Sequence, residues 1–278
     1  MENPEMLKEM VRQKYSEIAG QSKDANQSSC CGSGGCSTEV YNIMTDNYEG
    51  LEGYHSEADL GLGCGLPTQF AQIKPGDLVV DLGSGAGNDV FVARNQVGQD
   101  GRVIGIDFTP AMIDKAWENA DKLGYRNVEF RLGDIEDIPL ASNRADVVVS
   151  NCVLNLVPNK EKVFQEMFRI LKPGGHFSIS DVVLVGNLPK SLESDMEMYA
   201  GCVSGAISKE KYLNFIQAAG FENVRIQKEK EINIPTDILE KYLSKEEMKE
   251  LQKSKNGIFS ISVYGEKPKP CGCGPSCC

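Results

Sequence analysis

The sequence predicts an α/β fold in which a mostly parallel, seven-stranded sheet carries helices on both faces. From Leu78 onward, short apolar runs alternate with helical segments. Such alternation implies right-handed crossovers between parallel strands. A glycine-rich turn follows the first apolar run, where sheets of this kind bind ligands. A smaller C-terminal α+β region is expected to follow this sheet.

Five apolar runs in the middle of the chain are predicted to be the first strands. They are Leu78–Leu82, Arg102–Asp107, Val128–Leu132, Ala145–Ser150 and a strand within His176–Val185. Helices are predicted between them, notably at Pro110–Leu123 and Lys160–Leu171. The second helix has to stop at Lys172-Pro173-Gly174-Gly175, because proline and glycine cannot continue it.

The two ends of the chain are predicted as follows. Residues 4–19 have helical apolar spacing, and Gln21–Ser37 is a polar linker. Leu188–Gly220 is predicted to form two helices, with Ser208 capping the second. Late strands at Val224–Ile232 and Ile258–Tyr264 flank a helical segment near Asp237–Lys253. This region either completes the sheet or covers a substrate.

Composition excludes several classes of function. The chain has 278 residues, of which 41% are hydrophobic and 25% charged, with a net charge of −11. A negative surface repels phosphate backbones, so nucleic acid is not the expected partner. No run of about 18 apolar residues suggests a membrane span. Because Met1–Met10 lacks a secretory apolar core, we expect a cytoplasmic protein.

The ten cysteines are the unusual feature of the composition. In a reducing compartment, cysteines favour metal binding or catalysis over a disulfide framework. They fall into an N-terminal group, a C-terminal group and three scattered positions. The groups are Cys30, Cys31 and Cys36, then Cys271, Cys273, Cys277 and Cys278, and finally Cys64, Cys152 and Cys202.

A cofactor site is predicted at the carboxyl ends of the first three strands. The first strand runs into Gly83-Ser84-Gly85-Ala86-Gly87, where glycine lets the backbone approach a ligand closely. Asp107 ends the second strand and is placed to accept hydrogen bonds from ribose hydroxyls. Asp134 follows the third strand and is placed to meet an adenine amino group, with Ile135 covering a ring face.

The glycine pattern is GxGxG after Asp81, whereas the dinucleotide fingerprint is GxGxxG. Together with the Lys172–Gly175 turn, Asp81–Asp181 resembles the Rossmann-like class I methyltransferases, which use S-adenosylmethionine. A nicotinamide enzyme and a non-catalytic relative are the alternatives. The resemblance implies a set of cofactor-binding residues: Asp81, Gly83, Ser84, Gly85, Gly87, Asp107, Phe108, Met112, Asp134, Ile135, Glu136 and Asn151.

The methyl acceptor has to be inferred from the residues near the donor, because the fold does not specify it. Cys152 follows the fourth strand, at the edge where the donor's sulfonium is expected. The chain has only two histidines, His55 and His176, and no obvious general base lies beside Cys152. A thiolate prefers soft ions, and trivalent arsenic bound by thiolates keeps a lone pair that can attack a methyl carbon. No obligatory metal cofactor is expected.

Three cysteine segments resemble those of arsenite methyltransferases: Gly61–Thr68, Ser150–Leu156 and Tyr199–Ala206. The resemblance implies that Cys64, Cys152 and Cys202 bind As(III) and that methyl groups are transferred in successive rounds, which detoxifies arsenic. It also implies glutathione or thioredoxin as reductant and a role for an N-terminal cysteine, here assigned to Cys31. Leu62 occupies a position where eukaryotic members carry tyrosine.

Four regions follow from these interpretations. They are residues 1–40, with the N-terminal helix and cysteine-rich linker; 41–185, the cofactor-binding domain; 186–266, the substrate-binding C-terminal region; and 267–278, the cysteine-rich tail. The tail either captures and delivers arsenite or is dispensable. A monomer is expected by default.

Two rival functions remain open from the sequence. One is a methyltransferase that acts on carbon or oxygen of an apolar small molecule, with incidental cysteines. The other is a thiol-rich protein that binds metalloid without turnover. Each cysteine taken alone is also compatible with a small buried apolar residue.

Overall fold

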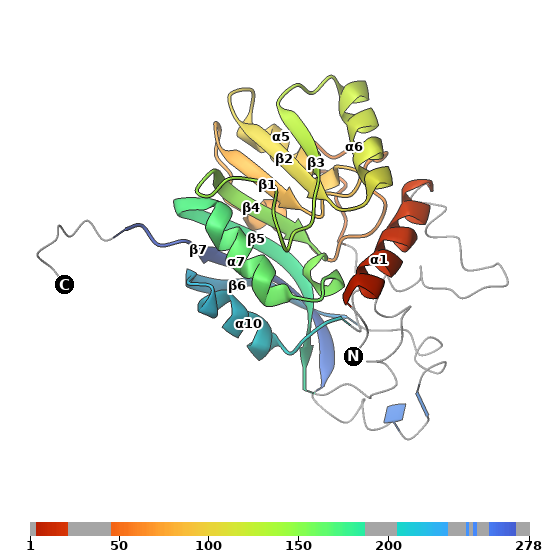
Figure 1. The fold of residues 1–278 in the computed structure, drawn as a ribbon, viewed down its shortest axis with the longest axis vertical. Helices are drawn as coiled ribbons and strands as arrows, with labels where there is room; N and C mark the ends of the chain where they lie inside the picture. Colours follow the sequence, from red (N-terminus) through yellow and green to blue (C-terminus); the bar gives the residue numbers. More distant parts are fainter. Residues whose placement is uncertain are drawn as a thin grey trace, which may run out of the picture.

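The computed structural model describes residues 4–21, 46–186, 205–232, 243–244, 247–248 and 256–270. Its centre is a seven-stranded sheet with the order β3-β2-β1-β4-β5-β7-β6, shown in Figure 1. Only β7 runs antiparallel to its neighbours. The strands are β1 (Leu78–Leu82), β2 (Arg102–Asp107), β3 (Val128–Leu132), β4 (Ala145–Asn151), β5 (Leu171–Val185), β6 (Glu222–Ile232) and β7 (Gly257–Glu266). The predicted fold class is confirmed.

Helices cover both faces of this sheet. α5 and α6 contact one face, and α7 and α10 contact the other. The helical segments are α1 (Pro4–Ala19), α4 (Pro67–Phe70), α5 (Asn88–Val97), α6 (Pro110–Leu123), the 3-10 turn η2 (Leu154–Leu156), α7 (Lys160–Ile170) and α10 (Lys209–Ala218). The helices predicted at residues 4–19, 110–123 and 160–171 are therefore confirmed, the last ending one residue earlier.

The central strands are mostly apolar because both of their faces are buried. Val79 and Val103 contribute to the cluster beneath α5 and α6. Their neighbours Val80 and Ile104 contribute to the cluster beneath α7 and α10. Successive side chains of a strand point to opposite faces, so a strand covered on both sides is apolar at most of its positions.

β5 begins earlier than the sequence predicts. The strand starts at Leu171, before the turn Lys172–Gly175, instead of within His176–Val185. Leu171 pairs with Ala145 and His176 with Val147, so the residues between them bulge out of the ladder. Gly174 and Gly175 exchange backbone hydrogen bonds of 2.8 Å with Lys267, which keeps this bulge on the sheet.

The C-terminal strands complete the sheet. Completing the sheet was one of the two alternatives predicted for this region, and covering a substrate was the other. β6 and β7 extend it beyond β5, and Ser208 caps α10 by accepting a hydrogen bond from the Lys211 amide. The first helix predicted within Leu188–Gly220, most of Asp237–Lys253 and the linker Gln21–Ser37 lie outside the described residues.

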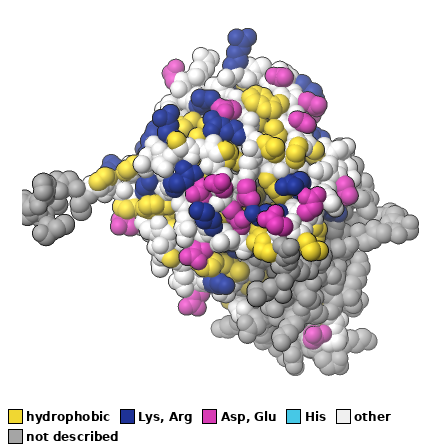
Figure 2. Space-filling model, viewed as in Figure 1, with side chains coloured by type: hydrophobic (Ala, Val, Ile, Leu, Met, Phe, Trp, Pro, Cys, Tyr) yellow, Lys and Arg dark blue, Asp and Glu magenta, His cyan; other side chains and the backbone are white. Residues whose placement is uncertain are grey.

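The visible surface mixes both signs of charge. Figure 2 shows lysine and arginine side chains interspersed with aspartate and glutamate over one face, without a continuous basic patch. This mixture agrees with the net charge of −11. Within the described ranges, no helix is both long enough and apolar enough to cross a membrane.

Candidate functional site

A cavity opens at the carboxyl ends of β1 to β4. The loops after these four strands line it, together with the segment before α4 and two residues of α1. Among its lining residues are Gly83, Ser84, Gly85, Asp107, Phe108, Asp134, Ile135, Asn151 and Cys152. The strand ends therefore bring most of the predicted cofactor residues together with one predicted arsenic ligand.

Asp107 holds the glycine turn against the end of β2. One of its carboxylate oxygens accepts a hydrogen bond of 3.0 Å from the Gly85 amide, and the other accepts one of 2.9 Å from the Thr109 amide. Gly85 has a φ of +50°, a left-handed conformation that glycine adopts without steric cost. Burial raises the pKa of Asp107, although these amide hydrogen bonds oppose the shift.

The cavity has an excess of buried carboxylates. Its lining includes five aspartates, one of which is Asp89, and a single lysine. Burial, together with the nearby charges of Asp89 and Asp107, raises the pKa of Asp81 well above its ordinary value. Burial also raises the pKa of Asp89 to about 6, against the effect of hydrogen bonds from Asn151 and Tyr48. A cationic ligand would relieve this concentration of negative charge.

S-adenosylmethionine fits this chemistry. It carries a sulfonium and an ammonium group, and its ribose hydroxyls need hydrogen-bond partners. Within the described residues, the Ser84 hydroxyl is buried without a hydrogen-bond partner. Buried polar atoms without partners are rare in native proteins. Such an atom, beside a glycine turn and several aspartates, is what a bound polar cation would satisfy.

Helix α1 closes one side of the cavity. Lys8 forms an ion pair of 2.7 Å with Asp134 and a second ion pair with Glu136. These two hydrogen bonds raise the pKa of Lys8, outweighing the opposing effect of burial. Tyr15 of the same helix also lines the cavity, and α1 lies beside α6 in Figure 1. The predicted adenine-binding residues therefore face the N-terminal helix.

Three of the predicted cofactor residues do not line the cavity. Gly87 caps α5 with a φ of +99°, and Met112 is fully buried in an apolar cluster. Glu136 contacts Lys8 and the Asn159 amide. Conversely, Tyr48 and Asp59 line the cavity without having been predicted, because they lie in an irregular segment with no recognisable motif.

Cys152 adopts a backbone conformation that is uncommon for a residue with a side chain. It follows β4 directly and has a φ of +60°, in the left-handed region. Its amide donates a hydrogen bond of 2.8 Å to the Ser180 carbonyl of β5. Such strain persists only where surrounding contacts enforce it, and it concentrates at functional sites.

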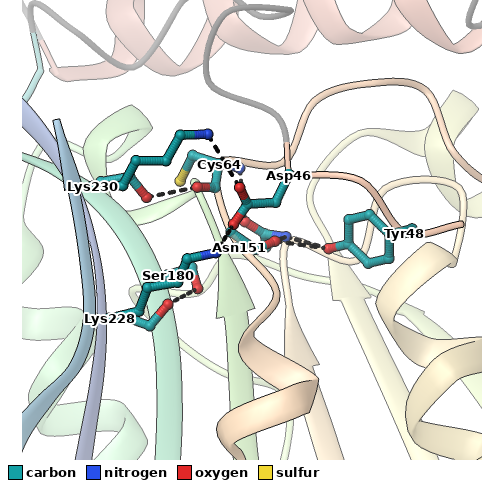
Figure 3. A network of polar contacts seen from close by, with 10 residues as sticks. Asp46, Tyr48, Cys64, Asn151, Ser180, Lys228 and Lys230 are labelled. Carbon is teal, nitrogen blue, oxygen red and sulfur yellow. Dashed lines mark hydrogen bonds and ion pairs between the residues drawn. The ribbon is translucent and has the colours of Figure 1, made fainter. Parts of the chain in front are cut away.

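Cys64 is held at the same sheet edge by contacts to two strands. Its amide donates to the Asn151 side-chain oxygen at 3.0 Å, and its carbonyl accepts from the Ser260 hydroxyl at 2.6 Å. Asn151 also donates to Tyr48 and to the Gly65 carbonyl, so it clamps the segment to the end of β4. Figure 3 shows Asn151 between Cys64 and Tyr48.

The glycines beside Cys64 allow this close approach. A Cβ atom on Gly63 would lie 2.6 Å from the Asn151 amide nitrogen. One on Gly65 would lie 2.5 Å from the Ser180 hydroxyl oxygen. Both distances are shorter than real Cβ contacts, so larger residues would push the segment away from the strands. The sequence Gly63-Cys64-Gly65 thus sets the position of the thiol.

The thiols of Cys64 and Cys152 converge on a third buried group, Asp181. The two sulfurs and one carboxylate oxygen all lie within 4.8 Å of one another. Cys64 and Cys152 belong to an apolar cluster that includes Leu156 and Val182. Cys202, Cys30, Cys31, Cys36 and the cysteines of the tail lie outside the described residues. The structure thus brings two of the three predicted arsenic ligands together.

Asp181 was not among the predicted site residues. Its carboxylate accepts hydrogen bonds from the Asn155 side chain at 2.9 Å and from the Tyr212 hydroxyl at 3.2 Å. Burial raises its pKa to about 7. The available signal was a single charged residue between Phe177 and Val185, a stretch of β5 whose other residues are apolar or serine.

Comparisons with known proteins give a consistent family. Residues 73–220 match the model of a methyltransferase domain family. An arsenite methyltransferase of Halobacterium salinarum is 44% identical, with 81% of this chain and 59% of that protein covered. One of Aquipseudomonas alcaligenes is 32% identical, with 84% and 67% covered. The chain therefore spans less than two thirds of the Halobacterium protein.

A solved structure agrees with these relatives. It is an arsenic(III) S-adenosylmethionine methyltransferase from Chlamydomonas reinhardtii, 31% identical to this chain. The two structures superpose with a TM-score of 0.62, covering 84% of this chain and 74% of the other.

Proposed function

Because this chain belongs to the arsenite methyltransferase family, we propose that it transfers methyl groups from S-adenosylmethionine to thiol-bound As(III), giving methylated arsenicals. The observation that carries this proposal is the convergence of two buried thiols, those of Cys64 and Cys152, beside the cavity at the strand ends. The relatives' activity suggests the substrate, and the two thiols are soft ligands of the kind that such a substrate needs.

The residues at the ends of β1 to β3 are proposed to hold the methyl donor. Asp107 is placed to accept hydrogen bonds from the ribose hydroxyls, and Ile135 to cover one face of the adenine. The buried carboxylates of Asp81 and Asp89 offset the positive charge of the ligand. When bound, S-adenosylmethionine supplies an electrophilic methyl carbon whose bonding electrons leave with the sulfur.

The thiols are proposed to hold arsenic with its lone pair free. Cys152 lines the donor cavity, and Cys64 lies behind it. Cys202 is proposed as the third thiolate and Cys31 as an auxiliary ligand. Arsenic bound to sulfur needs no deprotonation before it attacks carbon, so the protein contributes proximity and alignment. The apolar cluster around the thiols excludes water from the reacting atoms.

Each methyl transfer uses the arsenic lone pair for a new arsenic–carbon bond, which formally raises arsenic from the trivalent to the pentavalent state. A two-electron reductant therefore has to restore As(III) before the next round. Small thiols such as glutathione, or thioredoxin, supply electrons of this kind and can also carry arsenic to the site. We propose them as the reductants of this chain.

The decisive experiment incubates the full chain with arsenite, S-adenosylmethionine and a thiol, and then separates the arsenic species. Methylated arsenic is expected to appear together with S-adenosylhomocysteine. Arsenite binding without S-adenosylhomocysteine would indicate a sequestering protein instead. Methyl transfer to an apolar carbon or oxygen substrate, with arsenite unreacted, would indicate the other rival function.

A further inference from the structure

We propose that Asp181 accepts a hydrogen bond from the hydroxyl group that As(III) retains while only Cys64 and Cys152 hold it, before a third thiolate replaces that hydroxyl. The carboxylate is the third member of the buried cluster, within 4.8 Å of both sulfurs. This inference rests on the proposed function and assigns an oxygen-recognising residue to the same site. Asp181 would then be a substrate-binding residue that distinguishes arsenicals by whether a hydroxyl remains.

The chemistry of arsenite binding leaves such a hydroxyl. Arsenite enters as As(OH)3. Each exchange with a cysteine breaks one As–O bond and one S–H bond, forms one As–S bond, and releases one water. Two exchanges with Cys64 and Cys152 release two waters and leave one As–OH group. Arsenic remains trivalent and keeps its lone pair throughout these exchanges.

The surroundings of the thiols make a partner for that hydroxyl necessary. Cys64 is fully buried and Cys152 almost so, within an apolar cluster that also contains Leu156, Val182 and Leu184. A hydroxyl buried without a hydrogen bond is costly in such surroundings. In the described residues, the carboxylate of Asp181 is the acidic group that lies beside both sulfurs.

Hydrogen bonds from the described residues fix Asp181 in position. One of its oxygens accepts from the Asn155 side chain and the Val182 amide, both at 2.9 Å. The other accepts from the Tyr212 hydroxyl at 3.2 Å, and a hydrogen bond from the Leu154 backbone also lowers the pKa of this carboxyl. Because one carboxylate oxygen lies within 4.8 Å of both sulfurs, the hydroxyl of bound As(III) would share that oxygen with a protein donor. Because oxygen donors bind soft ions less well than thiolates, we assign the carboxylate to the hydroxyl and not to arsenic itself.

Phenylarsine oxide offers a direct comparison with arsenite. In water it presents two hydroxyls on arsenic, and both leave when two thiols bind. The resulting complex has no hydroxyl for Asp181 to recognise. Asp181→Asn is therefore expected to weaken arsenite binding while leaving the affinity for phenylarsine oxide unchanged.

The test uses full-length protein in which every cysteine except Cys64 and Cys152 is replaced by serine, so that bound arsenite keeps its hydroxyl. Affinities for both arsenicals are measured by titration calorimetry. Asp181→Asn is expected to weaken arsenite binding about tenfold, since charge-assisted hydrogen bonds are among the stronger ones. Ser178→Ala is the control on the same strand, because the buried Ser178 hydroxyl has no hydrogen-bond partner among the described residues.

A second variant tests the same inference in case Asp181→Asn does not fold. Tyr212→Phe keeps the carboxylate but removes a hydrogen bond that orients it, so arsenite affinity should fall severalfold and phenylarsine oxide affinity should not. Unchanged arsenite affinity, or equal loss for both arsenicals in both variants, would overturn the inference. Failure of the two-cysteine protein to bind either arsenical, while the unaltered chain binds arsenite, would also overturn the inference. Failure of the unaltered chain to bind arsenite would instead remove the proposed function on which it rests.

Discussion

The donor side and the acceptor side of the cavity are built in opposite ways. On the donor side, Gly83 follows β1, Asp107 ends β2 and Asp134 follows β3, so neighbouring β-α units place them together. On the acceptor side, Cys64 and Cys152 are 88 residues apart (152 − 64), and Asp181 lies a further 29 along (181 − 152). The first side is assembled by local repetition and the second by contacts between distant segments.

The two sides also differ in the physical property that they use. The donor side concentrates carboxylates, which attract a cation over some distance. The acceptor side places thiols in an apolar cluster, where their positions decide whether an ion is bound at all. Changes to charge should therefore act on donor affinity, and changes to position should act on acceptor chemistry. Four predictions test this separation.

The largest effect is expected from Cys152→Ser. A serine oxygen is a poor ligand for a soft ion, so arsenite methylation should fall at least about a hundredfold. Affinity for S-adenosylmethionine, measured calorimetrically without arsenite, should stay unchanged because the residue supplies no charge to the donor side. Full turnover in this variant would mean that thiols do not hold the acceptor.

Asp107→Asn is expected to weaken binding of the methyl donor and to change arsenite binding little. The substitution removes a carboxylate that holds Gly85 and that we propose to bind the donor's ribose. Hydrogen bonds to charged groups contribute about 1.5–3 kcal/mol, so affinity for S-adenosylmethionine should fall roughly tenfold to a hundredfold. Arsenite affinity, measured in the same protein, should change little. Parallel losses in both affinities would show that the two sides are coupled.

Gly65→Ala tests how far position controls the acceptor side. The new Cβ would meet the Ser180 hydroxyl, and overpacking of this kind costs about 1–3 kcal/mol. Arsenite affinity should fall about tenfold, with donor affinity kept. Gly20→Ala is the matched control, because Gly20, like Gly65, has no positive φ, and its new Cβ would meet only the Glu17 carbonyl oxygen at 3.4 Å, an ordinary contact distance. Equal loss of arsenite affinity in both variants would contradict a role for this contact.

The smallest effect is a pH dependence of donor binding. Burial raises the pKa of Asp89 to about 6, so the carboxyl is neutral at lower pH. A bound cation favours the charged form, so affinity for S-adenosylmethionine should rise severalfold as pH increases through about 6. Asp89→Asn should flatten this rise. An equally steep profile in that variant would assign the effect to another group.

The sequence by itself determined the parts whose information is local. Apolar runs located the central strands, because strands covered on both faces are mostly apolar. The glycine turn and Asp107 located the donor side, since the turn directly follows β1 and Asp107 ends β2. Cys64 and Cys152 were identified through their flanking residues, not through their spacing.

Only the tertiary structure decided how distant segments meet. It brings Asp181 against two thiols, turns Asn151 toward the Cys64 segment, and places Lys8 of α1 against Asp134. It also extends β5 back through the turn at Lys172–Gly175, because Lys267 pairs with those glycines. Periodicity records which face of an element is buried, whereas these contacts depend on sheet register and on loops that no local pattern encodes.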